Sequence, residues 1–190
     1  MTATAAPNGF RPVNHVGGGF ERSKVMLQGG IASGYNATIR YYDPVVLNAN
    51  GTLTIATPGS AFSGVFIGCE YDAVGRTGRL SRIWPANQVA TNIVAYMISD
   101  PSMEFTVQAN ASLALTAIGD EANWVTGAGN ASGYSTAALG ALVGAGNTGD
   151  FRVTGLYEIP GNQWGDAFPI VRVTMNRLTG LLPYAGAVAV

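Results

Sequence analysis

Charged side chains are scarce in this sequence of 190 residues. Only 11% of the residues are Asp, Glu, Lys or Arg, whereas globular domains usually contain about 25%. A soluble monomer normally needs more charge than this to keep its surface hydrated. Either the surface is largely neutral and polar, or another molecule covers much of it. The net charge is -1, so the overall basic character of nucleic-acid-binding proteins is missing, and we expect no nucleic-acid partner.

Residues that usually carry chemistry are equally rare. Cys69 is the only cysteine, which excludes an intrachain disulfide, and its apolar neighbours predict a buried, unreactive thiol. With His15 as the only histidine, most schemes for a metal site or a catalytic triad fail. Glu70 and Asp72 are the one nearby carboxylate pair that can share a strand face. We therefore expect no enzyme activity and no cofactor or metal, and keep a hydrolase or lyase acting through Glu70, Asp72 or His15 as a distant alternative.

Long apolar segments and nucleotide-binding motifs are also missing. No apolar run approaches the roughly 18 residues that a membrane helix needs, and the first ten residues lack the basic and apolar regions of a signal peptide. We therefore expect no membrane partner. Residues 144–149 match G-x-G-x-x-G by letter, but a strand follows where a dinucleotide site requires a helix. We interpret that match as chance.

Short strand patterns separated by turn residues run through most of the chain. The segment from Tyr42 to Tyr71 holds three of them, at 45–47, 52–55 and 64–68, and Asn48 to Gly51 supplies a tight turn between the first two. Further strands are expected at 35–42, 92–99, 103–109, 151–159 and 168–176, with 92–99 and 103–109 forming an antiparallel hairpin and 137–143 forming either a short helix or a strand. A mainly β fold follows, with an antiparallel, barrel-like domain.

Residues 1–34 differ from the rest of the chain. They are rich in glycine and proline and show no sustained period, yet they include apolar residues such as Phe10, Val13 and Phe20. Two interpretations stay open: an extended N-terminal arm that orders on a partner, or an irregular segment packed against its own domain. Residues 35–190 then form the β domain, with a Gly/Ala-rich insertion at about 126–149 and an apolar tail at 178–190.

The densest positive patch follows the central strands. Arg76, Arg79 and Arg82 are spaced by three residues, but Gly75, Gly78 and Pro85 argue against a helix. A solvated loop is the simpler interpretation. The alternative is a basic contact patch for an acidic partner surface.

Three groups of motifs, spread over most of the chain, occur together. They are NGFRPV at 8–13 followed by His15 and a glycine run; VAYMISDP at 94–101 with Glu104, Phe105 and Gln108; and GLY at 155–157 with Pro160, Asn162, Gly165, FPIVRV at 168–173 and Asn176. This set resembles a family of tailed-bacteriophage virion proteins. The order of the central strands is similar to the lambda type of head decoration protein, although the chain is longer and its 126–149 segment has no counterpart there.

The resemblance implies a capsid decoration, or cement, protein. Such a protein has a small barrel-like domain called a β-tulip with an extended N-terminal arm, and lies on the outer capsid surface of the virion. There it binds the major capsid protein, commonly as a homotrimer, and clamps neighbouring capsid subunits. A different virion structural protein, such as a minor capsid or tail component, is the main alternative. The candidate capsid contacts are Phe10, Arg11, Val13, Phe20, Arg76, Arg79 and Arg82.

Overall fold

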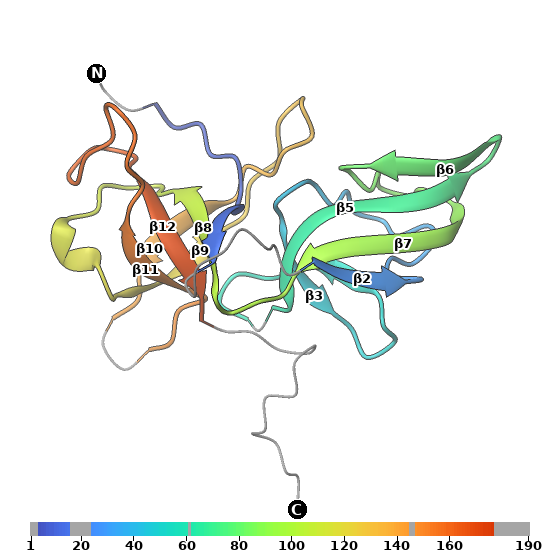
Figure 1. Ribbon diagram of the computed structural model, residues 1–190, viewed down its shortest axis with the longest axis horizontal. Helices are drawn as coiled ribbons and strands as arrows, with labels where there is room; N and C mark the ends of the chain where they lie inside the picture. Colours follow the sequence, from blue (N-terminus) through green and yellow to red (C-terminus); the bar gives the residue numbers. More distant parts are fainter. Residues whose placement is uncertain (1–3, 16–23, 61, 145–146, 177–190) are drawn as a thin grey trace, which may run out of the picture.

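The computed structural model describes residues 4–15, 24–60, 62–144 and 147–176, and these residues form two antiparallel β-sheets. Figure 1 shows the sheets side by side along the long axis of the molecule. Sheet A contains, in spatial order, β1 (Arg11–His15), β8 (Met103–Gln108), β12 (Ile170–Met175), β11 (Phe151–Leu156), β9 (Glu121–Val125) and β10 (Ala138–Leu142). Sheet B contains β2 (Lys24–Gln28), β7 (Ala90–Ile98), β5 (Gly64–Ala73), β3 (Pro44–Leu47) and β4 (Leu53–Ile55), and β6 (Arg76–Ser81) pairs with β5.

The mainly β, antiparallel fold predicted from the sequence is confirmed. The only helical element among the described residues is one 3-10 turn, η1 (Leu115–Ala117). The described strand pairing gives two open sheets with edge strands and does not show closure into a barrel. Within the described part of the chain, no helix has the length and apolar character that crossing a bilayer requires.

The central stretch folds as its pattern predicts. Strands β3 and β4 form a hairpin in which Val46 lies opposite Thr54. The turn between them closes through a 2.9 Å hydrogen bond from the Asn48 N–H to the Thr52 carbonyl. Gly51 has φ of 80°, a left-handed conformation that glycine adopts at little cost. The third strand, β5, is longer than expected and forms the middle of sheet B, paired with β7 on one side and with β3 and β6 on the other.

The predicted hairpin between 92–99 and 103–109 is wrong, although both strands exist. Strand β7 belongs to sheet B and β8 to sheet A, so the chain changes sheets between Ile98 and Met103. A four-residue link containing Pro101 makes this change. Both sheets gain from it, because Ile98 and Met103 are buried in the same hydrophobic core.

Residues 1–34 do not form a separate arm where the structure describes them. Strand β1 is an edge strand of sheet A and pairs with β8, and β2 is an edge strand of sheet B and pairs with β7. Phe10, just before β1, is completely buried. Its ring stacks on Phe151 with centroids 4.0 Å apart. For these residues the second interpretation, packing against the protein's own domain, is the one that holds.

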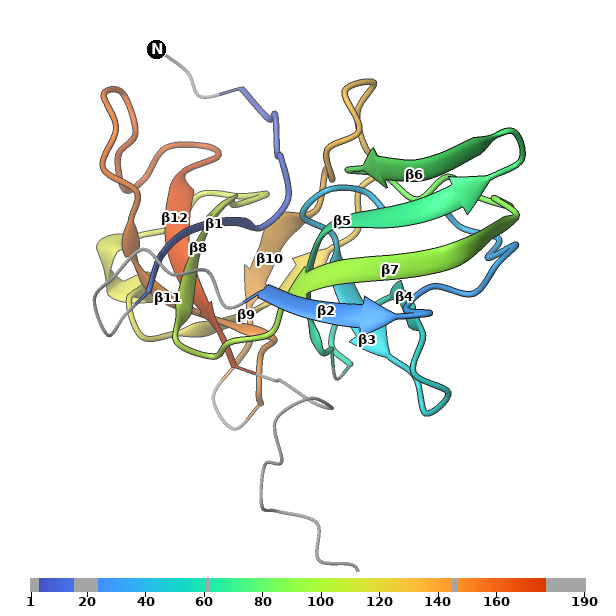
Figure 2. The ribbon, with the colours of Figure 1, turned by 45° about the vertical axis from the view of Figure 1, so that its right-hand side comes forward.

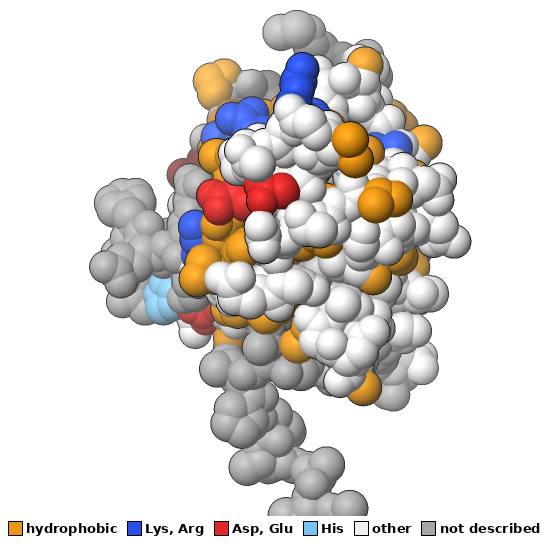
Figure 3. Space-filling view, turned by 90° about the vertical axis from the view of Figure 1, so that its right-hand side faces the viewer, with side chains coloured by type: hydrophobic (Ala, Val, Ile, Leu, Met, Phe, Trp, Pro, Cys, Tyr) orange, Lys and Arg blue, Asp and Glu red, His pale blue; other side chains and the backbone are white. Residues whose placement is uncertain are grey.

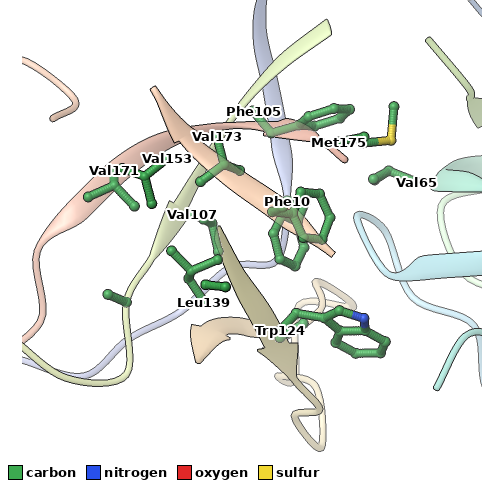
Figure 4. Close-up of a cluster of buried hydrophobic side chains, with 14 of the residues drawn as sticks. Phe10, Val65, Phe105, Val107, Trp124, Leu139, Val153, Val171, Val173 and Met175 are labelled. Carbon is green, nitrogen blue, oxygen red and sulfur yellow. The ribbon is translucent and has the colours of Figure 1, made fainter. Parts of the chain in front are cut away.

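Two hydrophobic cores hold the sheets together. The first lies on sheet A and also takes in Val65 and Ile98 from sheet B. Figure 4 shows Phe10 inside this core, among side chains from several strands of sheet A. The second core lies against sheet B and contains Tyr71 and Trp84, whose rings meet edge to face at 5.1 Å. Burying each large side chain contributes about 1.5–3 kcal/mol, so the shared first core stabilises the contact between the two sheets.

Two other sequence interpretations need correction, and one open alternative is decided. Residues 35–42 form no strand, and only the isolated bridges of Ile39 and Tyr41 remain from that prediction. Within the Gly/Ala-rich segment at 126–149, the strand alternative for 137–143 is confirmed, because β10 lies there and Leu139 is fully buried. The arginine segment is a strand, β6, rather than a loop. The apolar tail at 178–190 lies outside the described residues.

Candidate interaction surface

The β5–β6 hairpin is the outermost part of sheet B (Figures 1 and 2). Val74 and Gly75 form its turn. Beyond the turn the register shifts, and the Gly78 N–H donates a 2.5 Å hydrogen bond to Asp72 Oδ1. Asn92 Nδ2 donates to the other oxygen of the same carboxylate at 2.8 Å. These two hydrogen bonds, that of Asn92 foremost, lower the pKa of Asp72 from its usual value. The ionised carboxylate therefore fixes the shape of the hairpin.

Three basic side chains lie along β6 or directly after it. Arg76, Arg79 and Arg82 are all exposed. Among the described residues, no carboxylate oxygen lies within 4.0 Å of any of the three guanidinium groups. Figure 3 views the sheet B end of the molecule and shows mostly neutral side chains and backbone, with most basic atoms near its upper edge. Arg76, Arg79 and Arg82 thus form no ion pair within the described part of the chain.

Aromatic rings position two of these arginines. The guanidinium carbon of Arg79 lies 5.7 Å from the centre of the Tyr71 ring. That of Arg82 lies 5.4 Å from the Tyr41 ring, and its Nη1 donates to Tyr134 Oη at 3.3 Å. Cation–π contacts of this kind contribute about 0.5–1 kcal/mol at exposed sites. The two charges are therefore held in place while remaining accessible to a partner.

Exposed apolar side chains lie among the arginines. Val74 at the hairpin turn is 95% exposed and Leu80 on β6 is 71% exposed. Single exposed apolar residues are common, but here two lie on one hairpin beside unpaired charges. We call Val74, Arg76, Arg79, Leu80 and Arg82 together the β6 surface. A mixture of arginine and apolar side chains is typical of protein interfaces.

Arg11 and Val13 are not part of the β6 surface. They line a groove beside β1 at the edge of sheet A. Val13 lies at an irregularity in the pairing of β1 with β8. The groove has a volume of about 450 Å³ and is lined by Arg11, Pro12, Val13, Asn14, Glu104, Tyr157, Glu158 and Arg172. Arg11 and Val13, the two residues predicted from the sequence, therefore line a concave surface. This surface is distinct from the β6 surface.

The charges at the bottom of this groove are already partnered. Glu104 is 6% exposed. One of its carboxylate oxygens accepts a hydrogen bond from Thr154 Oγ1 at 2.5 Å, and the other lies 3.4 Å from Arg172 Nη1. A buried carboxylate that is paired in this way stabilises the junction of β8, β11 and β12. The groove therefore presents a concave surface and the exposed charge of Arg11 to a partner. Its buried carboxylate, Glu104, is already paired.

Of the two phenylalanines predicted to contact a capsid, Phe10 lies outside both surfaces. The structure corrects the interpretation of Phe10, because a side chain with 0% exposure cannot reach a partner without opening the core. Phe20 lies outside the described residues. Among the candidate contacts, the fold thus groups Arg76, Arg79 and Arg82 at one end of the molecule and Arg11 with Val13 in sheet A.

The residues considered for catalysis are not brought together. His15 lies on β1 in sheet A, with Nε2 3.2 Å from Asp100 Oδ2. Glu70 and Asp72 lie on β5 in sheet B, and Asp72 is engaged by Gly78 and Asn92. Cys69 is buried, and burial raises the pKa of its thiol to about 12. Across the described ranges, no group of three potential metal ligands is present.

The 144–149 glycine motif does not open a helix in the described residues. Strand β11 begins at Phe151, directly after the motif. Gly149 is packed closely enough that a Cβ there would lie 2.6 Å from the Ala122 nitrogen. Its N–H donates to Glu121 Oε2 at 2.8 Å. This glycine is therefore required by the packing of β9 against β11.

Sequence reasoning missed the aromatic support of the β6 surface. Tyr41 and Tyr134 contact each other edge to face at 5.8 Å, and both contact Arg82. These residues are far apart in the sequence, and no periodic pattern links them. Leu80 was also missed, because the glycines around it conceal the alternation of a strand.

Comparisons with protein family models, curated proteins and solved structures found no match.

Proposed function

We propose that this protein is a structural protein of a tailed-bacteriophage virion, namely a capsid decoration protein. It binds the major capsid protein on the outer surface of the head and stabilises the head by clamping neighbouring capsid subunits. The motif resemblance and the mainly antiparallel β fold support this proposal. The low charged fraction of 11% supports it as well, because a protein largely covered by neighbours needs little charge to stay hydrated.

The observation that carries the proposal is the β6 surface. Three arginines without an ion-pair partner among the described residues and two exposed apolar side chains lie on one hairpin or directly after it. Arginine is enriched in interfaces, and its guanidinium group binds carboxylates with two parallel hydrogen bonds. A contact between this hairpin and an acidic, partly apolar area of a capsid subunit would use both kinds of side chain.

This assignment moves the main attachment from the N-terminal segment to sheet B. Phe10 is part of the core, so it does not anchor the protein to a partner. Phe20 remains a candidate contact. Arg11 and Val13 remain candidates too, because they line the groove beside β1. A decoration protein that touches neighbouring capsid subunits needs more than one contact surface, and these two surfaces lie in different sheets.

Self-association is the second part of the proposal, with a homotrimer as the assembly. The tail at 178–190 has no charged residue, and an exposed apolar terminus favours association. Closed symmetry buries such a segment without producing filaments.

Co-sedimentation with undecorated capsids tests the function. We expect the full-length protein to bind saturably and to raise the temperature at which the capsid opens. Cryo-electron microscopy of the decorated particle then locates the protein. Density on the tail or inside the head would assign it to the alternative class, a tail or minor capsid component.

A further inference from the structure

The outer edge of β6 is an unpaired strand edge of sheet B. Among the described strands, β6 pairs with β5 alone. Figures 1 and 2 both show it as the outermost strand on this side of the sheet. The residues from Arg76 to Leu80 are all exposed. An edge of this kind presents backbone N–H and C=O groups to which another extended chain can hydrogen-bond.

The charge of this edge restricts what can pair with it. Arg76, Arg79 and Arg82 lie along or directly after β6 and lack a carboxylate partner among the described residues. A second copy of β6 would bring the same three positive charges alongside, and like charges on neighbouring strands repel each other. The arginines thus protect the edge against self-pairing while leaving it open to a strand of opposite charge.

The protein's own described strands do not supply the opposite charge. Each carboxylate on a described strand already has a partner: Glu70 hydrogen-bonds with Tyr96, Asp72 with Gly78 and Asn92, Glu104 with Thr154 and Arg172, and Glu121 with Gly149 and Arg152. These strand carboxylates are therefore engaged elsewhere and do not complement the charge of β6.

We propose that the outer edge of β6 binds an extended acidic segment of a partner protein as an additional strand of sheet B. The inference deepens the proposed function, and within that function the segment belongs to the major capsid protein. Arg79 and Leu80 are neighbours on the strand, so their side chains lie on opposite faces of the sheet. A segment that alternates acidic and apolar residues would match both faces at once.

The pairing of β6 with β5 supports this match. Arg79 lies opposite Tyr71 and Leu80 lies opposite Glu70. Arg79 therefore shares a face with an aromatic ring that already holds its guanidinium group. Because this charge is positioned before binding, less side-chain entropy is lost when a carboxylate pairs with it.

The first test uses a peptide probe and the full-length protein. The probe is a capped Glu-Val repeat of about eight residues, a common strand length, and a Lys-Val repeat of equal length is the control. Amide hydrogen exchange of the protein is measured with each peptide. We expect the Glu-Val peptide alone to slow exchange in the 76–82 segment. The inference would be overturned if a saturating concentration of the Glu-Val peptide left exchange in the 76–82 segment unchanged. It would also be overturned if the Lys-Val peptide slowed that exchange equally.

Matched variants separate charge from shape. Arg76 is exposed and its side chain forms no hydrogen bond or ion pair among the described residues, so Arg76→Glu should leave folding intact. We expect it, and the triple replacement of Arg76, Arg79 and Arg82 by Gln, to weaken peptide binding about tenfold, the combined effect of a few exposed ion pairs. Replacing the same three residues by Lys preserves the charge and should retain most of the binding. Equal loss in the Lys and Gln variants would contradict an edge selected by charge.

The second test separates this inference from the proposed function. Wild-type protein and the triple Gln variant are sedimented with undecorated capsids at ionic strengths of about 0.05 and 0.5 M, between which electrostatic screening increases strongly. Capsid binding that is unaffected by the Gln replacements keeps the function and overturns the role of β6. Binding of the Glu-Val peptide without any binding to capsids keeps the role of β6 and overturns the function.

Discussion

The rings of Phe10 and Phe151 stack face to face, with centroids 4.0 Å apart and planes 10° from parallel. This contact joins the segment before β1 to the first residue of β11, the strand two positions away from β8 in sheet A. Phe62 contacts the same ring of Phe151 at 5.1 Å. The N-terminal segment therefore completes the first hydrophobic core, and its removal would expose that core.

Replacing Phe10 by Ala should destabilise the protein strongly. Truncating a fully buried phenylalanine costs about 3–5 kcal/mol in the free energy of unfolding. Denaturant unfolding of the full-length protein measures this. Leu80→Ala is the control, because a surface truncation usually changes stability by less than about 0.5 kcal/mol. A Phe10→Ala protein of normal stability that no longer binds capsids would restore the interpretation of Phe10 as an anchor for a partner.

The strands could be predicted from the sequence where the local residue pattern determines them. The assignment of the strands to the two sheets could not be predicted. The β3–β4 hairpin follows from Asn48 to Gly51, a turn that these residue types specify locally. Strands β7 and β8 follow from alternation, but their assignment to different sheets depends on Ile98 and Met103 entering one core. The sequence around Phe10 does not show whether its ring contacts a partner or Phe151, because a contact with a residue far along the chain leaves no local sequence pattern.

The candidate surface was predictable in the same partial way. Charge alone identified Arg76, Arg79 and Arg82, and they do lie together. Their strand was not predicted, because a run of charged residues favours a solvated loop, whereas here Gly75 and Gly78 lie at a turn and an irregularity within a hairpin. Leu80 is identified as part of the surface only by the fold, which leaves its side chain 71% exposed beside the arginines.

Gln108 should hold the start of the described chain in place. Its side chain accepts a 2.7 Å hydrogen bond from the Ala6 N–H and donates to the carbonyls of Thr4 and Phe168. Gln108→Ala should therefore accelerate hydrogen exchange at residues 4–8 and lower global stability by about 1 kcal/mol. Gln163→Ala, at an exposed position, is the control. Unchanged exchange at residues 4–8 would show that Phe10 alone fixes this segment.

Glu121 should give stability an acid-sensitive component. Arg152 Nη2 lies 2.7 Å from its carboxylate and the Gly149 N–H donates to it, and these contacts lower the pKa of Glu121 from its usual value of 4.5. The stabilisation is therefore present above the unfolded-state pKa and is lost as the pH falls through the lower folded-state pKa. Glu121→Gln should reduce stability at pH 7 by about 0.2–1 kcal/mol, since Arg152 is half exposed.

Measuring the stability difference between wild type and Glu121→Gln at several pH values identifies the cause of that difference. The stabilities of wild type and Glu121→Gln should converge as the pH falls through the lowered folded-state pKa of Glu121, because the variant does not titrate at this position. Urea unfolding at several pH values measures the difference. Glu158→Gln removes an exposed charge and serves as the control. A difference between wild type and Glu121→Gln that stays constant down to pH 2 would mean that the carboxylate acts through packing instead of charge.

The apolar tail should drive self-association. Analytical ultracentrifugation of the full-length protein without capsids should show a trimer at micromolar concentration. A chain ending at residue 177 should be monomeric under the same conditions, because it lacks the uncharged 178–190 segment. A full-length monomer would exclude a preformed trimer and would leave only assembly on the capsid surface.

Tyr42 should reveal backbone strain at the junction of the two sheets. It is 9% exposed and has φ of 73°, a left-handed conformation that is unusual for a bulky residue. Its N–H donates to the Phe66 carbonyl and its C=O accepts from the Phe10 N–H. These two bonds join sheet B to the segment before β1, so the surrounding structure holds the strained conformation in place.

Comparing Ala and Gly at this position isolates the strain. Both replacements remove the ring and should destabilise the protein by several kcal/mol, with about 3–5 expected for a buried aromatic side chain. The left-handed conformation costs Ala about 1–2 kcal/mol, whereas Gly loses about 0.4–1 kcal/mol more through the entropy of the unfolded chain. Tyr42→Gly should therefore be more stable than Tyr42→Ala by about 0.5–1 kcal/mol. At neighbouring Tyr41, where φ is not positive, the order should reverse. If Ala is the more stable replacement at both positions, the junction is not strained.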